Sequence, residues 1–175
     1  TQVLPSAELV YGFSENLSAF GSWGQSFRLP TFTDLYYVGP TNLGNPDLKP
    51  EEANNFEGGL KYNRAKHFTQ ASVFNLQSSN MIDWVRDSIT QPWQPQNFES
   101  VNTLGAEFSY ELQQKATITD WLDLGFSRVA YTWLKMNRSS TGDVISRYAL
   151  NNLRHQVTLQ STLIAIHRVS LTTTA

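Results

Sequence analysis

The chain has 175 residues, of which 40% are apolar, 13% are aromatic and only 16% are charged. This aromatic content argues against a disordered chain, and the formal net charge of −2 argues against a broad nucleic-acid-binding surface. The absence of cysteine excludes a disulfide scaffold, a thiolate metal site and a cysteine nucleophile. No apolar run approaches the roughly 18 residues of a membrane-spanning helix. Taken alone, these numbers are typical of a soluble, aromatic-rich protein.

Apolar and polar residues alternate along much of the chain, which predicts strands with one apolar and one polar face. The clearest runs are 103–112 and 153–163. We predict the remaining strands at roughly 4–12, 17–27, 53–62, 67–86, 121–136 and 168–175. In 121–136 the apolar positions change parity, and a one-residue β-bulge near Arg128 would restore a single apolar face.

Short and long connectors alternate strictly between these strands. The short connectors are 13–16, 63–66, 116–120 and 164–167, and the long connectors are 28–52, 87–96 and 137–150. Transmembrane β-barrels show this order, with short periplasmic turns and longer outer loops. We therefore predict an all-β fold, an antiparallel up-and-down meander that forms about eight strands of a large transmembrane β-barrel. A soluble β-sandwich, in which the apolar faces bury each other, is the alternative that alternation alone leaves open.

An ordered set of motifs occupies the first long connector and the strand after it. Local chemistry explains part of it, because Pro30 ends the preceding strand and the run from Gly44 to Asp47 is dense in turn residues. The order in which these elements occur has no such local explanation. The motifs read Phe27-Arg28-Leu29-Pro30-Thr31-Phe32-Thr33-Asp34-Leu35-Tyr36-Tyr37, then Gly44-Asn45-Pro46-Asp47-Leu48-Lys49-Pro50-Glu51-Glu52, then Phe56-Glu57-Gly58-Gly59.

This order resembles that of the TonB-dependent outer-membrane receptors, whose barrels read F-R-x-P-T-F-x-x-L-Y-Y, then G-N-P-x-L-x-P-E, then an E-x-G strand. The resemblance continues through Met81-Ile82-Asp83-Trp84, Asn97 to Glu107, Tyr131-Thr132-Trp133 and 147–163, and so covers nearly the whole chain. Among subfamilies the spacing is most similar to that of the vitamin B12 (cobalamin) receptors, although siderophore and haem receptors share these motifs. The resemblance implies a structural role for Phe27, Arg28, Pro30, Thr31, Leu35, Tyr36, Gly44, Asn45, Pro46, Leu48, Pro50, Glu51, Glu57 and Gly59.

The resemblance also implies an energised importer in the outer membrane of a Gram-negative bacterium. Its expected partners are a small-molecule nutrient (cobalamin or an iron chelate), outer-membrane lipid, and TonB acting through an N-terminal plug region. Residues 1–175 contain neither that plug nor the family's C-terminal aromatic strand. We therefore expect an interior-to-late section of a barrel, and a section that can associate with copies of itself.

Aromatic and amide side chains in the long connectors are the candidate ligand contacts. They are Tyr36, Tyr37, Asn42, Trp84 and Trp93. Packing at the membrane boundary is the alternative role for the aromatic residues, since Trp and Tyr favour that boundary. Candidate charges on the lumen face, which would guide a substrate or contact the plug, are Glu107, Glu111, Asp123, Arg128 and Arg154. The alternative is that these side chains are simply solvated.

Other functional classes have less support in the sequence. Asp34, Asp47, Glu51 and Glu52 do not follow the calcium-loop pattern. Without a recognisable catalytic motif, we expect no enzyme activity, no cofactor and no metal site. A secreted β-rich binding module such as an adhesin is the rival from another class, and a barrel enzyme of the outer membrane is a third possibility.

Overall fold

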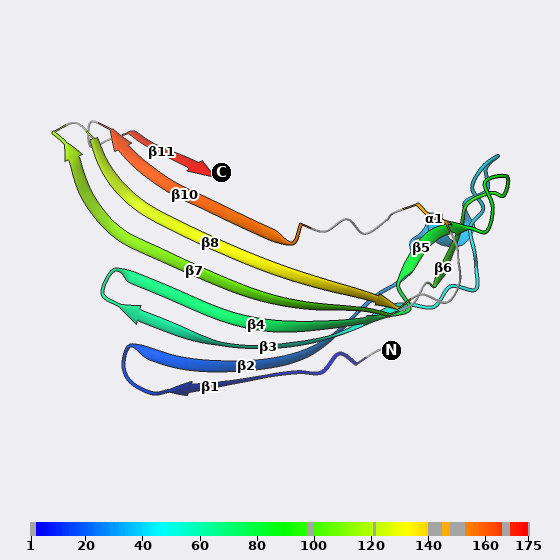
Figure 1. The fold of residues 1–175 in the computed structure, drawn as a ribbon, viewed down its shortest axis with the longest axis horizontal. Coiled ribbons are helices and arrows are strands. Elements are labelled where there is room, and N and C mark those ends of the chain that lie inside the picture. Colours follow the sequence, from blue (N-terminus) through cyan, green and yellow to red (C-terminus); the bar gives the residue numbers. More distant parts are fainter. Residues whose placement is uncertain are drawn as a thin grey trace.

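The computed structural model describes residues 3–97, 100–120, 122–139, 145–147, 153–165 and 169–174. Its main element is a single-layer sheet of eight strands in the order β1-β2-β3-β4-β7-β8-β10-β11 (Figure 1). The strands are Ser6–Gly12 (β1), Leu17–Arg28 (β2), Glu51–Arg64 (β3), His67–Ser79 (β4), Ser100–Thr119 (β7), Leu122–Ser139 (β8), His155–Ala165 (β10) and Val169–Thr174 (β11).

Every pair of neighbours in this sheet is antiparallel, and each strand lies beside the next sheet strand in the chain. The predicted all-β, up-and-down meander is therefore confirmed. Tight turns lie at one end of the strands, and the long connectors lie at the other (Figure 1). Most of 137–150 and the end of the predicted turn 164–167 fall outside the described residues.

The strand registers place most apolar side chains on one face of the sheet. One row across that face contains Tyr11, Ala19, Leu60, Ala71, Phe108, Tyr131 and Val157. The adjacent row, on the opposite face, contains Val10, Phe20, Gly59, Ser72, Glu107, Thr132 and Gln156. The apolar face is uncovered, since Leu60 is 50% exposed and Val157 is 59% exposed.

An irregularity in β8 explains the change of parity seen in the sequence. Leu124 pairs with Leu163, whereas Ser127 pairs with Ser161, so β8 has one more residue than β10 between these two pairs. The extra residue returns Val129 to the face of Leu124, as a bulge does. The predicted bulge is confirmed, but it lies slightly before Arg128.

The prediction of one continuous strand over 67–86 is wrong. β4 ends at Ser79, and Asn80 has a φ of 54°, a left-handed conformation that asparagine tolerates better than most residues. The chain then enters Ile82–Arg86 (β5), which belongs to a different sheet. The predicted strand 103–112 is too short, because β7 runs from Ser100 to Thr119.

A second small unit packs at the end of the large sheet that carries the long connectors. It contains the helix Phe32–Tyr36 (α1) and a three-stranded sheet in which β5 lies between Gln94–Asn97 (β6) and Ile145–Ser146 (β9). In the structure the three long connectors run between β2 and β3, between β4 and β7, and between β8 and β10. We call residues 29–50, 80–97 and 145–147 of these connectors the loop body. The predicted connector 87–96 therefore includes the start of a strand.

The buried apolar residues lie in or beside the loop body, and in the described part of the chain the large sheet encloses no core of its own. Among the described residues, the buried hydrophobic side chains are Trp84, Val85 and Val101. Within the same ranges, no helix has the length and apolar character needed to span a bilayer.

Candidate ligand site in the loop body

An ion pair closes the base of the first long connector. Arg28, at the end of β2, faces Glu51, at the start of β3, and donates to it through Nε (2.6 Å) and Nη2 (2.5 Å). Glu51 also accepts the backbone N–H of Ile82 at 2.7 Å. Because a bidentate pair fixes both distance and orientation, these two motif residues hold the ends of the connector together and join it to β5.

Helix α1 begins with a capping box. The Thr31 side chain accepts from the backbone N–H of Asp34 (3.1 Å), and an Asp34 oxygen accepts from the backbone N–H (3.0 Å) and hydroxyl (2.7 Å) of Thr31. This reciprocal arrangement satisfies N–H groups that a helix start otherwise leaves without partners. Thr31 therefore caps α1, and Pro30 lies just after β2 has ended at Arg28.

The other oxygen of Asp34 accepts from the indole Nε1 of Trp84 at 3.1 Å. Both side chains are buried, with Asp34 8% exposed and Trp84 9% exposed. Burial by itself raises the pKa of Asp34, but hydrogen bonds from Thr31 and Trp84, together with the nearby Arg28 charge, outweigh it. The net result is a pKa below the ordinary value for aspartate.

Further hydrogen bonds join the first long connector to the second. Asn45 donates to the carbonyl of Pro95 (3.1 Å), and Asn97 both accepts from the backbone N–H of Lys49 (2.7 Å) and donates to its carbonyl (2.9 Å). Gly44 allows the turn to approach α1, because a Cβ at this position would lie 2.8 Å from the backbone of Leu35 and of Tyr36.

Trp93 is held by the backbone of the first connector and by two arginines. The backbone N–H of Trp93 donates to the carbonyl of Thr41 (2.8 Å), and the carbonyl of Trp93 accepts from the backbone N–H of Leu43 (2.9 Å). The guanidinium carbon of Arg86 lies 4.3 Å from the centroid of the indole, and that of Arg147 lies 5.9 Å from it. Arg86 comes from β5 and Arg147 follows β9, so parts of all three long connectors meet at this ring.

The third connector is joined to the second through the backbone. The N–H of Arg147 donates to the carbonyl of Trp84 at 2.9 Å, and Val85 pairs with Ser146. In the amide orientation that satisfies both of its polar atoms, Asn42 donates to the carbonyl of Thr41 (2.8 Å) and accepts from Nη1 of Arg147 (3.3 Å).

The predicted ligand contacts are all in the loop body but differ in exposure. Tyr36 is 55% exposed and packs against Phe32, and Tyr37 is 44% exposed. Asn42 and Trp93 lie side by side in a parallel bridge. Trp84, in contrast, is buried with its indole nitrogen bonded to Asp34.

Sequence reasoning missed Arg86 and Arg147 as part of this group. Arg86 is the last residue of the predicted strand 67–86, so it was assigned to the sheet and not to a connector. The sequence offers one signal for Arg147, namely its position at the end of a long connector, but nothing that pairs it with Trp93.

The remaining motif residues and the candidate lumen charges lie on the sheet or at its end. Glu57 and Gly59 share the polar face with Glu107, and Glu111 faces Arg128 across β7 and β8. Asp123 is 1% exposed, and Arg154 is exposed just before β10. Phe27 faces Glu52, Pro46 lies in a turn, and Leu48 and Pro50 are half-buried.

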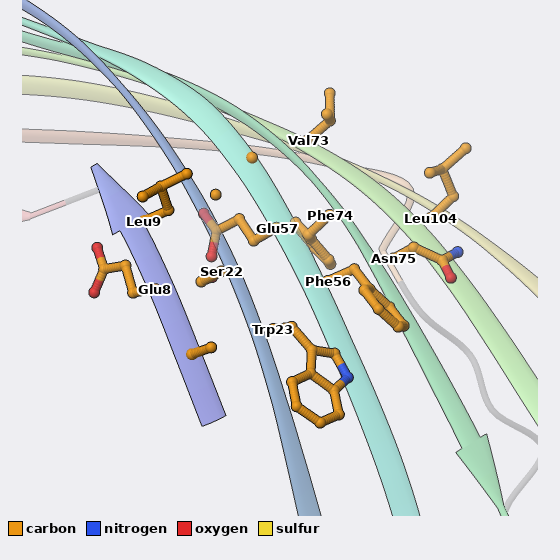
Figure 2. A pocket seen from close by; sticks show the side chains of 13 residues that line it. Glu8, Leu9, Ser22, Trp23, Phe56, Glu57, Val73, Phe74, Asn75 and Leu104 are labelled. Atoms are coloured by element: carbon orange, nitrogen blue, oxygen red, sulfur yellow. The ribbon is translucent and has the colours of Figure 1, made fainter. Parts of the chain in front are cut away.

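A hollow of about 670 Å³ crosses β1, β2, β3, β4 and β7, away from the loop body (Figure 2). On the apolar face, Gly21 and Gly58 lie between Leu9 and Val73 in one row, and Trp23 faces Phe56 in the next. The hollow therefore exists because the two central positions of this row are glycines without side chains. It lies on the apolar face of the sheet, and we do not assign it to nutrient binding.

A single-layer antiparallel meander with one apolar face, and with its long connectors packed together at one end, is a section of β-barrel wall. A family model described as "TonB dependent receptor-like, beta-barrel" matches residues 1–167. The chain belongs to the TonB-dependent receptor family, whose members and structural neighbours are receptors and transporters rather than enzymes.

Relatives and solved structures agree with this membership. The chain is 32% identical over 94 residues to the vitamin B12 transporter BtuB of Vibrio vulnificus (strain YJ016), which covers 54% of this chain and 15% of that protein. It is 28% identical over 102 residues to BtuB of Photobacterium profundum, covering 57% of this chain and 16% of that protein. This chain thus spans about a sixth of the length of these relatives.

Two solved structures share the fold at low identity. The FrpB iron transporter of Neisseria meningitidis superposes with a TM-score of 0.62 at 17% identity, covering 91% of this chain and 24% of that one. The copper transporter OprC has a TM-score of 0.60 at 16% identity, covering 90% and 23%.

Proposed function

We propose that this chain is an interior-to-late section of the barrel wall of a longer TonB-dependent receptor in the outer membrane of a Gram-negative bacterium. In this proposal the receptor imports a scarce nutrient, namely cobalamin. The loop body faces the outside and contributes to nutrient capture, while the apolar face of the sheet contacts lipid. TonB supplies the energy through a plug region that lies outside these residues.

The packed loop body is the observation that carries this proposal. Loops that are already held in one arrangement favour ligand capture, because ordering flexible loops on binding costs affinity. Here hydrogen bonds and strand pairing join the three long connectors at one end of the sheet. The matches to vitamin B12 transporters support cobalamin as the nutrient.

An iron chelate, such as a ferric siderophore or haem, is the second candidate nutrient. The specific observation in its favour is the structural likeness to an iron transporter and to a ferric-catecholate import receptor.

The test is nutrient uptake by cells that lack the full-length receptor containing this chain. We expect deletion to abolish uptake of radiolabelled cyanocobalamin at nanomolar concentration, and a plasmid copy to restore it. Deletion of tonB should have the same effect, because transport is energised. Unchanged cobalamin uptake together with lost uptake of a ferric siderophore or haem would favour the second candidate. Unchanged uptake of all three would contradict the proposed importer.

A further inference from the structure

The loop body contains a cationic cluster built around one aromatic ring. Arg86 and Arg147 both lie within 6 Å of the centroid of the Trp93 indole, at 4.3 Å and 5.9 Å. The Arg28–Glu51 ion pair lies elsewhere, at the base of the first connector. Among the described residues, no carboxylate forms an ion pair with Arg86.

The hydrogen bonding of Arg86 is also incomplete. Its Nη1 donates to the carbonyl of Ile89 at 3.0 Å, but its Nε, although shielded from solvent, has no acceptor among the described residues. The indole face attracts a cation but offers no oxygen lone pair to the remaining N–H groups. A guanidinium presents donors in a planar fork that suits carboxylate and phosphate oxygens.

The cluster is held in place from several directions. Trp93 is fixed by its backbone bonds to Thr41 and Leu43, and Arg86 lies on β5 at the centre of the small sheet. In the amide orientation that satisfies both of its polar atoms, Asn42 accepts from Arg147, which is exposed. Both guanidinium groups carry a positive charge, so each attracts an anion that binds beside the ring.

We propose that Arg86, Trp93 and Arg147 form a binding site for an anionic group of the nutrient. The anionic oxygens are those of a phosphodiester, as in cobalamin, or those of a catecholate or carboxylate iron chelate. Arg86 and Arg147 donate to these oxygens, and Trp93 positions the two guanidinium groups. This proposal rests on the proposed function, in that it places capture of the nutrient at the loop body.

The experiment measures binding to the full-length receptor in detergent by isothermal titration calorimetry. The probes are cyanocobalamin, an anionic ferric catecholate and a neutral ferric hydroxamate. The variants are Arg86→Gln, Arg147→Gln and the charge-retaining Arg86→Lys. Arg64→Gln is the matched control, because Arg64 is an exposed arginine at the opposite, tight-turn end of β3.

We expect Arg86→Gln and Arg147→Gln each to raise the Kd of the anionic probe that the receptor binds by about tenfold, which corresponds to the loss of one charge-assisted hydrogen bond. Arg86→Lys should lose less affinity, and Arg64→Gln should lose none. High salt should weaken wild-type binding more than binding to Arg86→Gln. Whether cyanocobalamin or the ferric catecholate responds identifies the source of the anion.

Several outcomes would overturn the site. Wild-type affinity for the anionic probe in both glutamine variants would do so, and it would leave the uptake experiment unaffected. Equal losses for the anionic probe and the neutral hydroxamate would also overturn it, because they would indicate a purely structural role. If the Arg86→Gln receptor does not fold, the Arg147→Gln receptor tests the site, because Arg147 is exposed and its replacement should not disturb folding. A receptor that binds no anionic probe contradicts the site and the proposed function together, whereas uptake in cells tests the function alone.

Discussion

Asp34 is a buried carboxylate that joins two segments far apart in the sequence. Its oxygens accept from the backbone and hydroxyl of Thr31 at the start of α1 and from Trp84 in β5. Because a buried donor that loses its acceptor costs free energy, this one side chain stabilises both the start of the helix and its contact with the second connector.

The first prediction concerns Asp34→Asn. The single carbonyl oxygen of asparagine cannot replace two carboxylate oxygens, so we expect the loop body to lose about 1–3 kcal/mol of local stability. The measurement is the rate of limited proteolysis within residues 29–50 of the folded receptor.

Asp47→Asn is the control, because it makes the same chemical change at an exposed position of the same connector. Combining Asp34→Asn with Trp84→Phe should cost less than the sum of the two single changes, because both remove one shared bond. Fully additive costs would contradict the role of this hydrogen bond.

The second prediction is the pH dependence of the same contact. The folded state lowers the pKa of Asp34, so its stabilising contribution is present above the unfolded pKa of about 4 and is lost as the pH falls through the folded pKa. Proteolysis of the connector by an acid-active protease should therefore accelerate below about pH 4. The wild-type receptor should show a larger acceleration than Asp34→Asn, and the difference between them is the contribution of Asp34. Identical pH profiles of the two proteins would contradict this contribution.

At the scale of the strand, the polar face has a close approach at Gly59. Phe20 and Ser72 flank this glycine across β2 and β4. A Cβ here would overlap the carbonyl oxygen of Ala71 and would lie 2.8 Å from both the Phe20 ring and the Ser72 Cβ. The backbone cannot move aside as a flexible side chain can. The close packing of β2, β3 and β4 at this point therefore requires a residue without a Cβ.

The third prediction compares adjacent glycines of β3. Gly59→Ala should destabilise the sheet by about 1–3 kcal/mol through overpacking. Gly58→Ala, on the opposite face, would place its Cβ 3.7 Å from the nearest atom, the carbonyl oxygen of Phe20, and should be close to neutral. The measurement is the urea midpoint of the full-length receptor in detergent micelles, and equal effects of the two changes would contradict this account.

Much of the strand arrangement could be predicted from sequence, because alternation and connector length are local signals. The meander and the bulge could be read in this way. The family resemblance pointed to Arg28, Thr31 and Glu51 as motif residues, but it did not predict the ion pair or the helix cap that they form. The break at Asn80 could not be located by periodicity, since β5 simply continues the apolar character of the segment. The contacts of Trp93 with Arg86 and Arg147 depend on how three separate connectors fold together, which no local pattern encodes.

At the scale of the whole molecule, the described sheet has two unpaired edges, β1 and β11, and an uncovered apolar face. Leu9 is 75% exposed, Val73 is 61% exposed and Leu159 is 54% exposed. Unpaired edges and large apolar patches both promote association.

The fourth prediction is that these 175 residues alone associate or require detergent. The measurement is light scattering after size-exclusion chromatography in buffer with and without detergent. A monodisperse monomer in plain buffer would contradict the lipid-facing assignment. It would favour instead the rival hypothesis of a secreted β-rich binding module.

The hydrogen bonds between the first two connectors have a consequence for engineering receptors of this kind. Each of these hydrogen bonds joins one residue of the first connector to one residue of the second. The pairs are Asp34 with Trp84, Asn45 with Pro95, and Lys49 with Asn97. Transplanting 29–50 or 80–97 alone onto a related barrel would separate every one of these partners. The two connectors therefore form a single structural unit, and a chimaera that exchanges either of them should move both together.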